Sequence, residues 1–401
     1  MGRTARLVLV DADGAVLGAL PPFELELPWW PEAGYVVAGA RAHWAVDVTV
    51  LRLLDADRPH PHGGAVTYLA ELHGPRPAGM ISLDPPPDLS PHPLRAPYAE
   101  PGGPARSLTW AAAELAGQGW PAVTALQQRT WNLSTVWRLD AADGQRAWFK
   151  EVPPMFGHEG ALLGWLGGHL PGVAPPLLAA DPAQRRMVMR DVPGHDWVDA
   201  DLAGRARIAE VAHRIHTYAA GHLDELLALG VPDRRGARLA AFLRSALAGT
   251  TPSVDEVMPD LDSRLAALAA CGLPDTLVHG DLWPGNTRQG TDGEVIVMDW
   301  GDASLGQPAF DLLAVTAGLD DATAAPLRER WAARWRAEVP GSDPERAAAL
   351  VVPIAPLYGA AVYATFVANI EPSEHPYHAD DVLAGLDRAA ELARATPMVT
   401  G

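Results

Sequence analysis

The chain has 401 residues, a formal net charge of −18 at pH 7, 38 glycines, 38 prolines and a single cysteine. This length allows two or three domains around a large core, and the negative charge argues against nucleic acid or an anionic membrane surface as a partner. The single cysteine, Cys271, excludes an internal disulfide and a multi-cysteine metal site, and it favours a reducing, cytoplasmic environment.

Residues 1–74 alternate strand-like apolar runs with turns. Residues 6–10 and 15–20 are predicted to form a hairpin around the turn Asp11–Gly14. A helix over 37–44 and two further strands over 46–54 and 65–72 complete the expected elements. We expect a small α+β domain that acts as a cap or an oligomerisation element. The apolar stretch at 7–10 stops at Asp11, which is too short for the core of a secretory signal.

A proline-rich segment follows this region. Ten of the thirty residues in 75–104 are proline, so the segment cannot form a helix or a central strand and is expected to be an extended linker. A helix over 108–117 comes next, with Ser107 as its expected N-cap.

Residues 105–192 contain this helix, several strand-like runs and a second helical pattern. Strands are predicted over 123–128, 134–140 and 147–150, and again over 186–192. Lys150 ends the third strand and is the only lysine of the chain. Glu159 starts a helical pattern, since leucines recur three, four and seven residues after it.

Residues 193–401 are predicted to be mostly helical. His213 and His216 share one face of a helix over 206–218, and we interpret both as structural because no third ligand has matching spacing. The apolar run 348–370 is long enough to span a bilayer. It contains Pro353, Pro356 and several polar residues, which favours a buried helix kinked near the prolines.

The most informative motif lies at 278–299. Asp281 stands five residues before Asn286, and Asp299 ends the apolar strand 295–298. Phosphoryl transfer by kinases needs this set: one carboxylate to deprotonate the acceptor hydroxyl, and an amide oxygen with a second carboxylate to hold magnesium. Asp281 is the predicted base, and Asn286 and Asp299 are the predicted metal ligands. The competing interpretation is an ordinary hairpin with a turn rich in Asp, Gly and Asn.

The chain resembles the aminoglycoside-phosphotransferase and choline-kinase-like family of small-molecule kinases. The resemblance rests on His279-Gly280-Asp281 with Asn286, and on Asp299-Trp300 with Ala303, Gly306, Asp311 and Leu312. It implies a bilobal protein-kinase-like fold, with an antiparallel-sheet N-lobe over 105–192 and a mostly helical C-lobe over 193–401. It also implies ATP and Mg²⁺ as cofactors and a hydroxyl group as acceptor.

The same resemblance suggests further roles. Lys150 and Glu159 match the ion pair that holds the α and β phosphates. The hairpin loop 129–133 lacks the usual glycines, and phosphate contacts are expected from Ser134, Thr135 or the amides of the loop. Met189, Asp191 and Val192 are expected at the interlobe hinge, where adenine meets the backbone. His279 and Asp311 are expected to stiffen the catalytic loop.

The acceptor is left open by the sequence. The predicted wall residues are aromatic, acidic or amide side chains: Trp283, Trp300, Asp302, Tyr358, Tyr363, Asn369 and Glu371. They would suit a sugar, an amino-sugar, an aminoglycoside or a related metabolite, and each aromatic residue could equally belong to the core. The oligomeric state and the choice between ATP and GTP also stay open.

Two rival functions are considered. A protein kinase needs a long peptide-docking segment after the metal aspartate, and here Asp311-Leu312-Leu313 follows Asp299 within about a dozen residues. A nucleotide-binding pseudokinase or scaffold, whose N-terminal domain mediates protein interaction, is the second rival. Lys150, Glu159, Asp281, Asn286 and Asp299 are all present, which argues against it.

Overall fold

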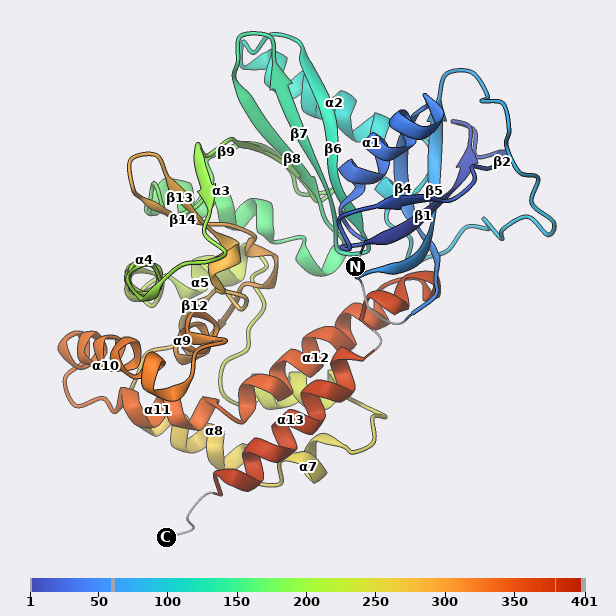
Figure 1. Cartoon of the computed structure of the whole chain (residues 1–401). Coiled ribbons are helices and arrows are strands. Elements are labelled where there is room, and N and C mark those ends of the chain that lie inside the picture. Colours follow the sequence, from blue (N-terminus) through green and yellow to red (C-terminus); the bar gives the residue numbers. More distant parts are fainter. Residues whose placement is uncertain (1, 59–61, 379, 398–401) are drawn as a thin grey trace. The chain divides into compact units, whose positions relative to one another are not determined.

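The computed structural model describes residues 2–58, 62–378 and 380–397 (Figure 1). The chain divides into two compact units. Unit 1 comprises residues 1–157, 177–191 and 366–380, and unit 2 comprises residues 158–176, 192–365 and 381–401. The N-terminal region and the predicted N-lobe sheet therefore fall into the same unit.

Unit 1 begins with a five-stranded sheet whose main strand order is β2-β1-β5-β4, with β3 paired to β1. Its elements are β1 (Arg3–Val10), β2 (Val16–Ala19), β3 (Phe23–Leu25), α1 (Ala33–Trp44), β4 (Asp47–Ala56) and β5 (Gly64–His73). The hairpin around Asp11–Gly14 is confirmed, since β1 and β2 pair antiparallel with Val8 opposite Ala19. β1 also pairs with β5 in parallel. Alternating β1 residues such as Leu7 and Leu9 are fully buried in one core with Val36 of α1.

The segment between β5 and α2 (Gly103–Gly117) contains one short element, the 3-10 helix η1 (Pro97–Ala99). Helix α2 begins four residues before Ser107, and Gly102 at φ 70° is its N-cap. The Ser107 prediction was therefore wrong. Pro104 is tolerated in the first turn because the N–H groups there lack helical partners anyway. The Ser107 hydroxyl instead donates a hydrogen bond to the Glu151 carboxylate at 2.6 Å.

The second sheet of unit 1 is antiparallel throughout and has the strand order β6-β7-β8-β10-β9. Its strands are β6 (Val123–Trp131), β7 (Ser134–Ala141), β8 (Arg146–Glu151), β9 (Leu177–Asp181) and β10 (Arg186–Arg190), and the 3-10 helix η2 (Pro154–Phe156) follows β8. The predicted strands are confirmed, whereas β9 was not predicted. Gln127 of β6 connects the two sheets. Its side-chain amide donates to the Val50 carbonyl at 2.7 Å and accepts the Val50 N–H at 2.9 Å, as a paired peptide group would.

Unit 2 is mostly helical, and two small sheets in it carry the loops that contain the motif at 278–299. Its helices are α3 (Glu159–His169), α4 (Leu202–Ala219), α5 (Leu223–Ala228), α6 (Ala237–Ala246), α7 (Val254–Val257), α8 (Leu261–Ala270), α9 (Ala309–Thr316), α10 (Asp321–Glu338), α11 (Pro344–Val351), α12 (Ile354–Ala368) and α13 (Asp381–Ala395). The last residues of α12 and the 3-10 helix η5 (Pro372–Tyr377) belong to unit 1. A large apolar core joins α6, α8 and α9–α13.

The small sheets of unit 2 pair β11 (Gly194–Asp196) with β13 (Thr287–Gly290) and β14 (Val295–Val297), and β12 (Thr276–Val278) with β15 (Ser304–Gly306). Two 3-10 helices, η3 (Pro284–Asn286) and η4 (Trp300–Asp302), flank the β13–β14 hairpin. The strands are short, and their turns hold the polar residues of the sequence motif.

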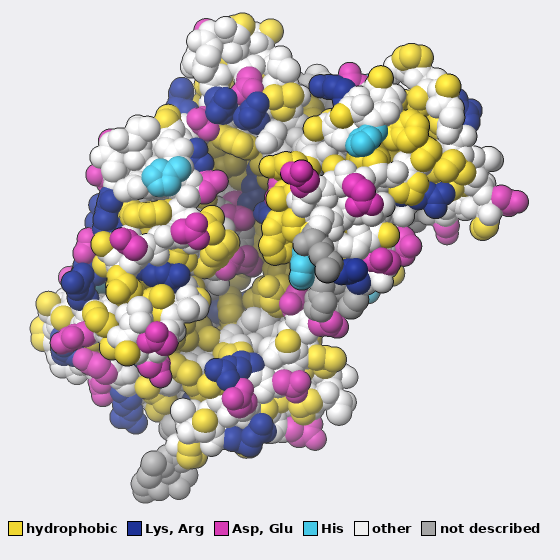
Figure 2. Space-filling view, viewed as in Figure 1, with side chains coloured by type: hydrophobic (Ala, Val, Ile, Leu, Met, Phe, Trp, Pro, Cys, Tyr) yellow, Lys and Arg dark blue, Asp and Glu magenta, His cyan; other side chains and the backbone are white. Residues whose placement is uncertain are grey.

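The predicted break in the apolar run is confirmed. Helices α11 and α12 meet at Val352-Pro353 with a bend of 49°, because a proline there cannot donate a helical hydrogen bond. Among the described residues, no single helix has the length and apolarity needed to cross a membrane, although this bent pair passes the same test jointly. Figure 2 shows acidic side chains spread over the visible face of the molecule, in line with the net charge of −18.

Candidate active site

The catalytic-loop motif lies on the two small sheets of unit 2. His279 follows β12 directly, Asn286 immediately precedes β13, and Asp299 follows β14. β13 and β14 pair antiparallel with Thr287 opposite Val297, and the Met298 N–H donates to the Asn286 carbonyl at 2.8 Å. This register places Asn286 and Asp299 at the same end of one hairpin.

Asn286 holds Asp281 directly. Its side-chain amide N–H donates to Oδ2 of Asp281 at 2.7 Å and to the Asp281 carbonyl at 2.9 Å. The nitrogen end of the amide is therefore committed to Asp281, and the oxygen end is the one that can ligate a cation.

The environment of Asp281 raises its pKa to about 6. Burial is the largest cause, because it disfavours the charged carboxylate, and the charge of Asp299 adds to it. His279 and the Asn286 hydrogen bond oppose the rise in pKa. A carboxylate with this pKa is ionised at pH 7 and is a stronger base than an exposed aspartate.

Asp311 holds the backbone of the catalytic loop in place. Its carboxylate accepts the backbone N–H of His279 at 2.9 Å and that of Gly280 at 3.1 Å, and His216 of α4 lies 2.9 Å from Oδ2. Burial alone would raise the pKa of Asp311, but the hydrogen bond and charge of His216 hold it below its usual value. The predicted stiffening role of Asp311 and the structural interpretation of His216 both match this geometry.

His279 and Gly280 shape the turn itself. The His279 ring lies 2.8 Å from the Met298 carbonyl through Nε2, so it ties the loop to the end of β14. Gly280 has a φ of 84°, and a Cβ on it would lie 2.4 Å from the Asp302 carbonyl. Only glycine fits at this position.

Asp299 adopts the left-handed backbone conformation, with φ 58° and ψ 72°. Few residues other than glycine adopt this conformation, although Asp and Asn do so more often than most, and such backbone strain concentrates at functional sites. The next residue, Trp300, donates its N–H to Oε1 of Glu159, the first residue of α3, at 3.2 Å. Glu159 therefore positions the segment that follows Asp299, a role that the sequence did not predict.

Lys150 is the fifth residue of β8 and is buried, with 8% of its surface exposed. In unit 1 it is paired in register with Val136 of β7 and Met187 of β10. The predicted Lys150–Glu159 ion pair stays a prediction.

The side-chain hydroxyl of Thr135 does not have the exposure that the expected phosphate contact needs. Its hydroxyl donates to the Arg129 carbonyl at 3.4 Å and accepts from the Trp137 indole at 3.0 Å, and only 1% of the residue is exposed. This hydroxyl is engaged inside the sheet and cannot reach a ligand. The Ser134 hydroxyl accepts from the Trp131 indole at 3.2 Å.

The hinge residues lie where the chain passes from unit 1 to unit 2, between Asp191 and Val192. The Asp191 carboxylate accepts from the Trp148 indole at 2.6 Å, and the Val192 carbonyl accepts from Arg288 at 2.6 Å. Met189 is buried in β10. The position of the three residues fits the expected hinge, while their adenine contacts stay a prediction.

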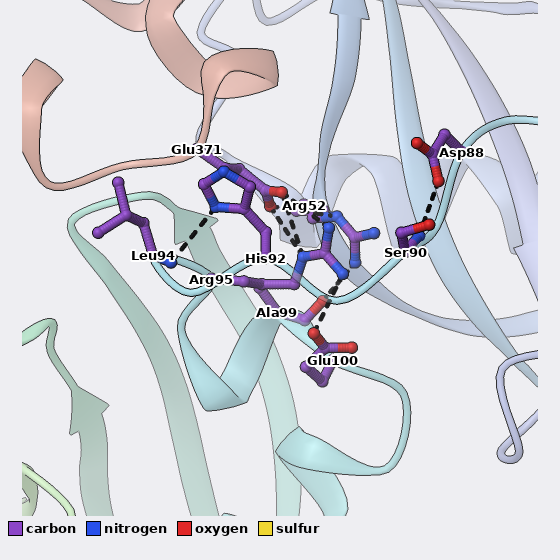
Figure 3. Close-up of polar contacts among 9 residues, drawn as sticks. All are labelled: Arg52, Asp88, Ser90, His92, Leu94, Arg95, Ala99, Glu100 and Glu371. Carbon is purple, nitrogen blue, oxygen red and sulfur yellow. Dashed lines mark hydrogen bonds and ion pairs between the residues drawn. The ribbon is translucent and has the colours of Figure 1, made fainter.

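Two of the predicted acceptor-wall residues are placed elsewhere. Trp300 is 1% exposed, donates its indole N–H to the Val297 carbonyl at 3.0 Å and packs edge-on against His279, so it supports the loop from within the core. Glu371 lies in unit 1 and binds two arginines. Arg95 contacts it at 2.8 Å and Arg52 at 3.3 Å, with all three side chains buried (Figure 3). Its carboxylate is neutralised there, and an acceptor role is wrong.

The remaining wall residues differ in position. Trp283 is 41% exposed beside the catalytic loop. Burial raises the pKa of Tyr363 to about 12, and the charges of Asp381, Asp281 and Asp302 add to the rise. The Tyr358 hydroxyl lies 3.4 Å from Ser304. Asn369 is exposed, beyond the end of α12, and belongs to unit 1.

The donor set of the loop suits magnesium. Among the described residues, no group of three or more His, Cys, Asp or Glu side chains could hold a metal by itself. Magnesium takes oxygen ligands and keeps several waters, so the Asn286 amide oxygen and the Asp299 carboxylate are adequate when phosphate oxygens complete the shell.

Comparisons with known proteins agree with this geometry. Residues 125–350 match the family model described as "Phosphotransferase enzyme family". None of the curated proteins matches the chain. The structure of choline kinase LicA from Streptococcus pneumoniae aligns with a TM-score of 0.54 and 15% identity, over 73% of this chain and 100% of that one.

Two further solved structures are similar at lower scores. Macrolide 2'-phosphotransferase MphH from Brachybacterium faecium has a TM-score of 0.48 and 21% identity, over 73% of this chain and 99% of that one. A choline/ethanolamine kinase family protein from Mesorhizobium loti has a TM-score of 0.47 and 19% identity, over 73% and 96%. The expected protein-kinase-like fold, with an antiparallel sheet and a mostly helical part, is confirmed.

Proposed function

Because the chain belongs to the phosphotransferase enzyme family, an enzyme class that transfers phosphate to hydroxyl groups, we propose that it is an ATP- and Mg²⁺-dependent small-molecule kinase. The acceptor is the hydroxyl group of a sugar, an amino-sugar, an aminoglycoside or a related polar metabolite. The observation that carries the proposal is the 2.7 Å hydrogen bond from Asn286 to Asp281, on a loop that Asp311 fixes through two backbone N–H groups.

Asp281 is the proposed base. The bond from Asn286 occupies Oδ2, which leaves Oδ1 to orient the acceptor hydroxyl and take its proton as the new P–O bond forms. A pKa of about 6 suits this task, since the group is ionised near neutral pH and still accepts a proton late in the transfer.

Asn286 and Asp299 are the proposed ligands of magnesium. When bound, the metal would supply positive charge that offsets the charge of the nucleotide phosphates. The backbone geometry supports this proposal, because Asp299 has a left-handed conformation next to the hairpin and the Met298 N–H donates to the Asn286 carbonyl. Lys150 is proposed to bind the α and β phosphates, as a compact ammonium does.

A pseudokinase or scaffold role is the alternative proposal. The two proposals are separated by adding ATP and Mg²⁺ to the full chain with a panel of sugars, amino-sugars and aminoglycosides, and by following ADP release together with the mass of the acceptor. Acceptor-dependent ADP release with a phosphorylated product supports the kinase. Tight Mg·ATP binding without turnover on any acceptor would favour the scaffold.

A further inference from the structure

Unit 2 contains a small pocket beside the catalytic loop that the roles above leave unused. Its volume is about 210 Å³, and its walls are mostly apolar, formed by Leu239, Val278, Phe310, Leu313, Ala314 and Ala355. Gly280 of the catalytic loop also lines it. Gly280 directly precedes Asp281 in the chain, so the pocket adjoins the catalytic loop at the residue before the proposed base.

One charged side chain lines this pocket, that of Arg234. The backbone N–H of Arg234 donates to the Leu305 carbonyl at 2.8 Å, so the residue is fixed alongside β15. Its guanidinium lies 3.4 Å from the ring centroid of Phe242 and interacts with the Tyr358 hydroxyl. Ring stacking of this kind holds a guanidinium in one orientation.

The charge of Arg234 differs from the charges of its neighbours in whether a carboxylate pairs with it. Arg235 and Arg238 both pair with Asp233. Among the residues that the structure describes, no carboxylate pairs with Arg234, although the chain has 49 acidic and 31 basic residues. Burial lowers the pKa of Arg234, but a guanidinium stays charged in proteins. A partly desolvated charge without a counter-ion is unfavourable unless a ligand supplies one.

The other polar side chains of the pocket can also donate hydrogen bonds. They are the hydroxyls of Tyr358 and Ser304, 3.4 Å apart. Together with Arg234, the pocket therefore has three hydrogen-bond donors, and its described lining contains no carboxylate. Donors surrounded by apolar walls suit an anionic group that is attached to a hydrocarbon surface.

We propose that this pocket binds an anionic group on an apolar portion of the phosphoryl acceptor, and that Arg234 selects it. A carboxylate and a phosphate monoester share the required chemistry. The inference rests on the proposed kinase function, and it narrows the acceptor class. It favours a hydroxylated acid and disfavours a polycationic aminoglycoside, whose ammonium groups Arg234 would repel from this pocket.

The test measures binding to the full chain without nucleotide, so that it does not depend on turnover. Benzoate, phenyl phosphate and neutral benzamide are titrated in ligand-observed NMR. At least one of the two anions should bind about tenfold or more tightly than benzamide, since charge-assisted hydrogen bonds are about twice as strong as neutral ones. The anion that binds better identifies the source of the charge.

Three variants locate the binding. Arg234→Gln should abolish the preference for the anion, whereas Arg235→Gln, the matched neighbour paired with Asp233, should keep it. Ala355→Leu fills the pocket and should weaken binding of the anion about tenfold or more without touching Arg234. Each variant is first checked for an unchanged melting temperature, which excludes general unfolding.

Several results would overturn the inference. They are equal binding of benzamide and both anions, a preference that survives Arg234→Gln, anion binding that survives Ala355→Leu, and no binding of either anion up to about 10 mM. None of these results affects the kinase proposal, which depends on ADP release and on product formation.

Discussion

His216 on α4 and Asp311 on α9 form a buried pair, with Nε2 and Oδ2 separated by 2.9 Å and 2–3% of each side chain exposed. Asp311 passes this support on to the backbone of His279 and Gly280. Two helices thus fix the position of the catalytic loop. Asp281 directly follows this turn, which the Asp311 side chain of α9 contacts directly and His216 of α4 supports through Asp311.

His216→Ala should lower both stability and turnover. The change leaves the Asp311 carboxylate with one donor fewer in a dry site, which costs about 1–3 kcal/mol, and it loosens the loop. Thermal unfolding and kcat provide the measurements. His213→Ala is the matched control, since His213 packs edge-on against Trp335 and burial lowers its pKa to about 4. The pair has no such role if His216→Ala changes kcat no more than His213→Ala.

Asp299→Ala should weaken the magnesium-dependent binding of ATP. In calorimetric titrations with Mg²⁺ the variant should bind ATP clearly more weakly than the wild type, and without Mg²⁺ the two should bind alike. Asp292→Ala provides the control, because Asp292 is exposed at the turn between β13 and β14. Identical Mg²⁺-dependent titrations would remove Asp299 from the metal site.

Thr135→Val should reduce stability without weakening nucleotide binding. The Thr135 hydroxyl is buried between Trp137 and Arg129, so its loss leaves the Trp137 indole without that acceptor and costs about 1–3 kcal/mol. Melting temperature and the Kd for Mg·ATP are measured together. A weakened Kd at unchanged stability would restore the phosphate role expected from the sequence.

Glu374 should make unit 1 less stable at alkaline pH. Burial, followed by the charge of Glu371, raises the pKa of Glu374 to about 8 from an ordinary value of 4.5. Between these two pH values the folded state binds more protons than the unfolded state, so the free energy of unfolding falls as pH rises. Glu374→Gln should therefore raise the melting temperature at pH 9 and leave it nearly unchanged at pH 4.5.

The control for this prediction is Glu371→Gln. It removes the partner of Arg95 and Arg52 and should destabilise the protein at both pH values (Figure 3). A pH profile of stability that Glu374→Gln does not alter would contradict the assignment.

The catalytic loop could be predicted from the sequence because its geometry is local. Asp281, Asn286 and Asp299 lie within one turn and one hairpin, so their spacing fixes their neighbourhood. The same holds for the hairpin at Asp11–Gly14 and for the kink at Pro353, where short-range chemistry decides the structure.

The failures depend on tertiary packing, and in one case on a partner that is distant in the chain. Glu371 pairs with Arg95, which lies 276 residues away in the chain. No local pattern in the sequence indicates this partner. Trp300 was expected to line the acceptor site, but its indole N–H donates to the Val297 carbonyl inside the core. Thr135 was expected to contact phosphate, yet its hydroxyl accepts a hydrogen bond from the Trp137 indole within the sheet. Such outcomes depend on tertiary packing, which spacing alone does not specify.

Asp281→Asn is the most direct test of the account. The change keeps the shape of the side chain and removes the proton acceptor, so kcat should fall on the order of 10²-fold or more. The Kd for Mg·ATP should stay within about twofold of the wild type, since this carboxylate is assigned no direct contact with nucleotide or metal and the asparagine oxygen can still accept the Asn286 N–H. Single-turnover phosphoryl transfer to an active acceptor measures kcat, and calorimetry measures Kd. A variant that retains more than about a tenth of the wild-type kcat would contradict the assignment of Asp281 as the base.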